Sequence, residues 1–91
     1  MIKVEIRKSF INDLKSIKGN VYYDRIKNLA LFELPKMDSM KEIRNLKKLK
    51  GFRKYYRIRV GEFRIGLSIE NDVLILERVL NRKDIYNYFP K

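Results

Sequence analysis

The chain has 91 residues, enough for one folded domain, and its 22 lysines and arginines outnumber 11 acidic residues to give a net charge of +11. It contains no cysteine and no histidine, which excludes disulfides, thiol nucleophiles, imidazole catalysis and most transition-metal sites. The chain lacks an apolar run long enough for a membrane helix, and its N-terminus lacks the apolar core of a signal peptide. We therefore expect a soluble, cytoplasmic protein with an anionic partner.

The N-terminal third of the chain predicts one strand and a helical hairpin. Residues 2–6 alternate apolar and polar side chains, which is typical of a strand. Ser9 is the expected cap of a first helix, which Gly19 is placed to end. Apolar residues then repeat at helical spacing from Asn20 until Pro35 stops the second helix.

A short third helix is expected next in the chain. Ser39-Met-Lys-Glu42 matches a capping box, in which the Ser and Glu side chains satisfy free backbone amides. We expect the helix to continue through Ile43 and Leu46, whose side chains would reach the core.

The C-terminal half predicts three strands in succession. Residues 55–60 and 63–70 alternate apolar and polar side chains, and Gly61-Glu62 between them is typical of a tight turn. Asn71-Asp72 marks a second turn, after which residues 73–80 are almost continuously apolar, as expected of a central strand covered on both faces. The predicted order is β-α-α-β-β-β, with residues 82–89 as a short helix or irregular chain. This order predicts a single α+β domain over residues 1–91, an antiparallel meander packed against the helical hairpin.

Positive charge is concentrated in residues 47–64, where eight lysines and arginines face a single acid. Four aromatic residues are interleaved with these cations: Phe52, Tyr55, Tyr56 and Phe63. Cations suit phosphate contacts and aromatic rings suit base stacking, so this segment favours nucleic acid as the partner.

Three short runs resemble the RelE/ParE toxin superfamily: Leu49-Lys-Gly51, the segment 56–64 and the segment 81–86. The resemblance is strongest over residues 46–86. It implies a type II toxin–antitoxin toxin that is held inactive by a small antitoxin encoded beside it. RelE-like members are mRNA interferases, which enter the ribosomal A site and cleave mRNA there. ParE-like members inhibit DNA gyrase without cleaving RNA.

The resemblance also implies a set of catalytic residues. The RelE branch uses basic residues on the strand after Leu-x-Gly, an arginine that begins the next strand, another arginine after the last strand, and a tyrosine near the C-terminus. The matching positions here, which favour the RelE branch, are Arg57, Arg59, Arg64, Arg82 and Tyr86. The best-known member has lysines at the first two positions, and many relatives have histidine where this chain has Asn81. The resemblance therefore does not identify the general base.

Cleavage in this family resembles attack of a ribose 2′-hydroxyl on the adjacent phosphorus, which needs a base, charge stabilisation and an acid. Arginine suits charge stabilisation because its planar fork holds two phosphate oxygens, but it is a poor base. Tyr86 is the best candidate proton carrier because neighbouring arginines favour its phenolate. It alternatively stacks on a base, or packs in the core. The alternative for Arg64 is a surface ion pair with Glu70 or Glu77.

A fringe of further cations is expected to contact RNA or the ribosome without a catalytic role. Its members are Lys47, Lys48, Lys50, Arg53 and Lys54. The acidic residues show no paired spacing, so we expect no metal and no cofactor. The expected partners are a small acidic RelB-like antitoxin, the ribosome and mRNA, with no membrane. Two alternatives remain open: a ParE-like gyrase inhibitor, and a basic RNA-binding module that has lost cleavage.

Overall fold

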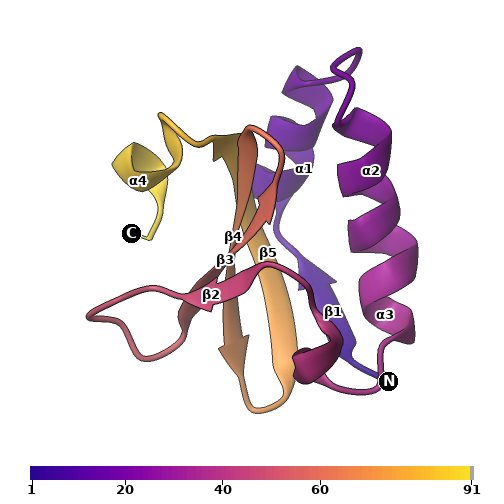
Figure 1. Ribbon diagram of the computed structural model, residues 1–91, viewed down its shortest axis with the longest axis vertical. Helices are drawn as coiled ribbons and strands as arrows, with labels where there is room; N and C mark the ends of the chain where they lie inside the picture. Colours follow the sequence, from indigo (N-terminus) through magenta and orange to yellow (C-terminus); the bar gives the residue numbers. More distant parts are fainter. Residues whose placement is uncertain (91) are drawn as a thin grey trace.

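The computed structural model describes residues 1–90 and shows a mixed five-stranded sheet with a layer of helices on one face (Figure 1). The main elements are β1 (Lys3–Ile6), α1 (Lys8–Ser16), α2 (Tyr23–Asn28), α3 (Leu34–Lys36), β2 (Leu46–Lys48), β3 (Tyr55–Val60), β4 (Phe63–Glu70), β5 (Val73–Asn81) and α4 (Ile85–Tyr88). The predicted α+β class is confirmed. No helix within residues 1–90 has the length and apolar character needed to cross a membrane.

The strands lie in the order β1-β5-β4-β3-β2. Strands β3, β4 and β5 form the predicted antiparallel meander, and β1 pairs with β5 in parallel. The predicted turns are also present, with φ of 53° at Asn71 and 65° at Asp72. Gly61 has a φ of 58°, and the ring of Tyr22 fills the space that a Cβ there would need. A glycine is therefore required at this turn on both counts.

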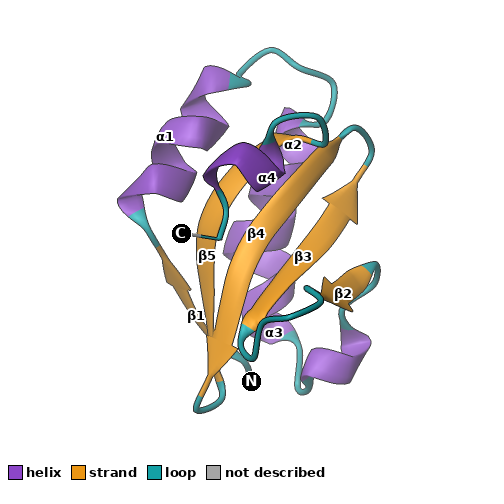
Figure 2. Cartoon of the chain, turned by 90° about the vertical axis from the view of Figure 1, so that its left-hand side faces the viewer, coloured by secondary structure: helices purple, strands orange, loops and turns teal. Residues whose placement is uncertain are grey.

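The hydrophobic core lies between the sheet and the helices (Figures 1 and 2). From the helical layer it receives the fully buried side chains of Phe10, Ile26 and Leu34. From the meander it receives Ile58, Ile65, Leu67, Leu74, Leu76 and Val79. In β3 the buried residues alternate with polar ones, and in β5 the residues between them, such as Ile75 and Glu77, are only half-buried, so this core lies on one side of the meander.

The second predicted helix is longer than α2 alone. It continues from α2 through a π-helical turn, Leu29–Glu33, into α3 and ends at Lys36, one residue past Pro35. It begins at Tyr23 rather than at Asn20, whose side-chain oxygen instead accepts a hydrogen bond from the amide of Tyr22. Asn20 therefore forms a turn before the helix, which is a common role for asparagine.

Two local predictions are wrong. Arg7, not Ser9, occupies the N-cap of α1. The predicted capping box is present at Ser39, but it begins only a 3₁₀ turn, Met40–Glu42. Leu46 begins strand β2, because it pairs with Ile58 and so extends the sheet beyond β3. Pairing with an exposed strand edge outweighs the local helical signal here.

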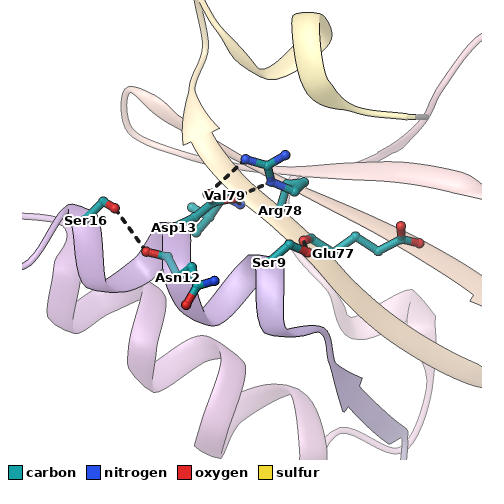
Figure 3. A network of polar contacts seen from close by, with 7 residues as sticks. All are labelled: Ser9, Asn12, Asp13, Ser16, Glu77, Arg78 and Val79. Atoms are coloured by element: carbon teal, nitrogen blue, oxygen red, sulfur yellow. Dashed lines mark hydrogen bonds and ion pairs between the residues drawn. The ribbon is translucent and has the colours of Figure 1, made fainter.

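Ser9 and Asp13 of α1 instead cover the edge of β5 that β1 leaves unpaired (Figure 3). The hydroxyl of Ser9 donates a 2.6 Å hydrogen bond to the carbonyl of Glu77, and Asp13 Oδ2 accepts one of 3.1 Å from the amide of Val79. Asp13 also forms a two-pronged ion pair with Arg78, at 2.7 and 3.0 Å. Helix side chains thus satisfy the backbone groups that a neighbouring strand would otherwise pair.

Candidate active site

The sheet face away from the helical hairpin gathers the predicted arginines. In the β3–β4 ladder Arg59 lies directly opposite Arg64, and Arg57 lies opposite Gly66. Residues paired in this way point to the same face, and their sequence neighbours Ile58 and Ile65 are buried on the other. The alternation predicted from the sequence therefore sets three guanidinium groups on one surface.

The β3–β4 turn brings Arg82 to the same corner. The guanidinium of Arg64 donates hydrogen bonds to the carbonyls of Gly61 and Phe63, at 2.9 and 3.0 Å. The backbone amide of Arg82 donates to the carbonyl of the neighbouring Glu62 at 2.8 Å. This hydrogen bond holds Arg82, the residue after β5, against the β3–β4 turn, and Arg64 donates to a carbonyl of the same turn.

Arg57, Arg59, Arg82 and Tyr86 all lie near enough to Arg64 to influence its charge. Partial burial lowers the pKa of Arg64 below its ordinary value, and the positive charges of Arg57, Arg59 and Arg82 lower it further, while Tyr86 raises it. Each of these effects requires proximity.

Ion pairs within residues 1–90 involve none of these four arginines. In particular, Arg64 does not pair with Glu70 or Glu77, since it bonds to backbone carbonyls instead. Like charges gathered without a carboxylate form a ready site for an anion. No group of acidic side chains in this part of the chain is arranged to hold a metal ion.

Helix α4 lies across the open face and carries Tyr86 (Figure 1). It is anchored by Ile85 and Phe89, which are almost fully buried, whereas Tyr86 is 57% exposed. Phe89 packs against Gly66, where an added Cβ would lie 2.5 Å from its ring. The alternative that Tyr86 is a core aromatic is therefore wrong, whereas Phe89 packs against the sheet.

A groove of about 560 Å³ opens beside this cluster, bordered by the β2–β3 loop and α4. Its lining includes Lys47, Lys48, Lys50, Phe52, Arg57 and Tyr86. Three lysines of the predicted fringe thus line the groove.

Two other members of the predicted fringe, Arg53 and Lys54, do not line the groove. Lys54 Nζ lies 4.0 Å from a carboxylate oxygen of Glu70 and 5.5 Å from the centre of the Tyr55 ring. Part of its charge is therefore engaged within the protein.

Sequence reasoning missed two contributors to this region. Phe89 helps to line the groove together with Phe52, which the sequence placed among the aromatic residues suited to base stacking. Arg78 also lay outside the predicted set, because its partner Asp13 is distant in the chain. Its guanidinium lies 5.4 Å from the centre of the Tyr88 ring, so it contacts α4 as well as α1. The hydrogen bond to Asp13 raises the pKa of Arg78 above its ordinary value.

Comparison with known proteins identifies the family. Toxin RelE3 of Methanocaldococcus jannaschii is 44% identical over 90 residues, which cover 98% of this chain and 100% of that protein. This chain belongs to the RelE toxin family. No family model matches the sequence.

Solved structures agree with this RelE-family assignment. A chain in the crystal structure of the RelB–RelE antitoxin–toxin complex from Methanococcus jannaschii has 43% sequence identity and a TM-score of 0.76, over 94% of this chain and 99% of that one. A chain in the E. coli DinJ–YafQ complex reaches a TM-score of 0.71 over 94% of this chain and 99% of that one. Its identity is 13%, so this second likeness shows the fold alone.

Proposed function

We propose that this RelE-family chain is a type II toxin that acts as a ribosome-dependent mRNA endonuclease. The observation that carries the proposal is the cluster of four arginines beside an exposed tyrosine, with no carboxylate of residues 1–90 paired to any of them. Such a cluster suits a phosphodiester whose negative charge increases as it reacts. The groove lined by lysines then offers a path for the flanking RNA.

The proposed reaction is an internal transesterification. The ribose 2′-oxygen forms a bond to the adjacent phosphorus while the bond from phosphorus to the 5′-oxygen breaks. One proton leaves the 2′-hydroxyl and another reaches the 5′-oxygen, so the products are a 2′,3′-cyclic phosphate and a 5′-hydroxyl. No oxidant, metal or cofactor is needed for this balance.

In this mechanism arginines stabilise charge and a separate group moves protons. Arg64 and Arg82 hold the non-bridging oxygens, because a planar guanidinium donates two parallel hydrogen bonds. Tyr86 is the nearest side chain of the cluster that can exchange a proton at its hydroxyl. With this limited set of groups, the ribosome contributes by holding the 2′-oxygen in line with the bond that breaks.

Neutralisation by an acidic, amphipathic antitoxin segment completes the proposal. RelB is named as the antitoxin in the related complex that is 43% identical to this chain. Here the helical hairpin exposes Ile11 and Leu31, which border an apolar groove of about 200 Å³, and Lys15 and Lys27 lie beside them. Apolar side chains flanked by cations match an acidic amphipathic segment. The proposal of an acidic antitoxin segment would be wrong if the purified complex contained a neutral antitoxin and its affinity did not change with salt concentration.

The experiment is mRNA cleavage in a translating extract, with gyrase supercoiling measured in parallel. Wild type should cut mRNA and leave supercoiling unchanged. The Arg64→Ala, Arg82→Ala double variant should lose cleavage, and Arg7→Ala, an exposed arginine at the start of α1, should keep it. A folded double variant that cleaves within about threefold of wild type rules out this site, since losing even one such donor commonly costs more. Supercoiling inhibition without mRNA cleavage would favour the ParE-like alternative.

A further inference from the structure

The groove beside the arginine cluster has two chemically different contributors. Lys47, Lys48, Lys50 and Arg57 supply positive charge, and no carboxylate of residues 1–90 lines it. The ring of Phe52 supplies apolar surface. A volume of about 560 Å³ is within the usual range for small-molecule sites and exceeds that of one nucleobase.

Phe52 is exposed and yet held in place. Its side chain is 45% exposed, although the residue lies in the loop between β2 and β3, where a polar side chain is the ordinary choice. The ring packs edge-to-face on Tyr55, with centroids 5.7 Å apart and an interplanar angle of 71°. Tyr55 packs in turn on the buried Phe89, with centroids 5.5 Å apart. The series of rings supports Phe52 from the sheet outward, which reduces the entropy lost when a ligand stacks on it.

The loop and α4 project from the same side of the sheet (Figure 1). Arg57 both lines the groove and lies near Arg64, so the groove is continuous with the proposed reaction site. A ligand in it therefore combines negative charge with a flat apolar surface. An unpaired nucleotide has both properties, since its phosphate meets the lysines and its base meets an aromatic ring.

We propose that Phe52 is the stacking platform of a nucleobase subsite, which holds an unpaired base of the mRNA close to the phosphate that reacts. This inference rests on the proposed endonuclease function and adds a specificity-determining residue to it. A purine offers the larger stacking surface, so the subsite favours a purine at that position.

The experiment measures binding to programmed ribosomes whose mRNA carries a 2′-O-methyl group at the cleavage position, so that no cutting occurs. Phe52→Ala should weaken binding on the order of tenfold, the size of one base–aromatic stack. Phe52→Leu, which keeps apolar packing on Tyr55, should lose nearly as much, and Phe52→Trp should bind like wild type. The matched control is Phe32→Ala, since Phe32 is exposed on the helical hairpin away from the groove.

A series of mRNAs with one abasic nucleotide locates the stacked base. At one position, removal of the base should weaken wild-type binding by the same factor as Phe52→Ala, and should not weaken Phe52→Ala further. If the losses multiply at every position, no base stacks on Phe52 and the proposal is overturned. It is also overturned if Phe52→Ala weakens antitoxin binding but not mRNA-dependent binding, because a protein segment then occupies the groove.

A free single-stranded RNA separates failure of this inference from failure of the proposed function. The probe is a short oligonucleotide with 2-aminopurine at the position found above, or at each position in turn. Wild type should quench its fluorescence and Phe52→Leu should not. Quenching without any cleavage on ribosomes would keep the subsite and reject the endonuclease. Cleavage by wild type, with neither quenching nor any effect of an abasic nucleotide, would keep the endonuclease and reject the subsite.

Discussion

The two faces of the meander differ in almost every physical property, although the same strands form both. The helix-covered face holds fully buried aliphatic side chains such as Ile58 and Ile65. The opposite face holds Arg57, Arg59 and Arg64, which repel one another and have no carboxylate partner within residues 1–90. Burial on the first face supplies the stability that offsets repulsion on the second. Residues that stabilise the fold and residues suited to bind an anion therefore alternate along β3 and β4. A substitution can change one of these two properties without changing the other.

The sharpest test of that separation uses neighbours on β4. Ile65→Ala should lower the free energy of unfolding by about 3 kcal/mol, because it leaves a cavity in the core. Its cleavage rate per folded molecule should be unchanged. Arg64→Ala should lower the single-turnover cleavage rate on saturated ribosomes on the order of a hundredfold, with less than about 1 kcal/mol lost in stability. Denaturant unfolding and single-turnover kinetics measure the two effects.

Arg64→Lys refines this test, because a point charge reproduces only part of a two-pronged phosphate contact. We expect it to recover part of the lost rate. Full activity in Arg64→Ala, or slow cleavage by fully folded Ile65→Ala, would mean that stability and chemistry are not divided between the two faces.

The second prediction concerns the ion pair at the edge of the sheet, which joins the two faces. Asp13→Asn keeps an acceptor for the amide of Val79 but loses the two-pronged charged contact with Arg78. We expect the free energy of unfolding to fall by about 2 kcal/mol, the contribution of a hydrogen bond between charged groups. Asp72→Asn, in an exposed turn at positive φ that asparagine tolerates, is the matched control and should stay within about 0.5 kcal/mol. Equal stabilities in urea titrations of the two variants would contradict the prediction.

The third prediction concerns the position of α4 and uses a substitution that changes no charged residue. Gly66→Ala places a methyl group against Phe89, which must shift and carry Tyr86 with it. We expect the saturated cleavage rate to fall about tenfold through misplacement of groups at the reaction site. Gly19→Ala is the control, since nothing lies within 4 Å of its added Cβ and its positive φ affects stability only. A normal rate for Gly66→Ala would show that the position of α4 does not matter to the chemistry.

The smallest expected effect is on the lysines of the groove. Lys48→Ala and Lys50→Ala should each weaken ribosome association a few-fold and reduce its salt slope by about one. The single-turnover rate at saturation should stay near wild type. Lys18→Ala, at the end of the helical hairpin remote from the groove, should change neither quantity. Binding titrations over a salt series measure the slope, and a large loss of the saturated rate would mean that the reaction site is misplaced.

Local patterns account for most of the predicted fold. Alternation over residues 55–60 and 63–70 correctly assigned Ile58 to the covered face and Arg57 to the open one. It failed for Leu46, because membership of β2 depends on pairing with Ile58, a contact outside any local window. The cap predicted at Ser9 failed for the same reason, since the carbonyl of Glu77 that Ser9 contacts is 68 positions away.

The predicted catalytic residues came from motif resemblance, and their roles stay predictions. The structure adds how they meet: opposite positions in the β3–β4 ladder, a turn that carries the amide of Arg82, and α4 packed on Gly66. It also adds Phe52 to the groove and removes Arg53 and Lys54 from its lining.

The sequence by itself determined most of the element types, the covered face of strands β3 and β4 and the concentration of positive charge, because these depend on the spacing of side chains along one segment. Tertiary structure alone decided that β1 joins β5 in parallel, that Asp13 pairs with Arg78, and that α4 lies across the open face. Each of these joins groups far apart in the chain. The free energy of these contacts depends on geometry that no local sequence pattern contains. The strand edge that β1 pairs with, the Asp13–Arg78 ion pair and the space above Gly66 that Phe89 fills exist only after the sheet has formed.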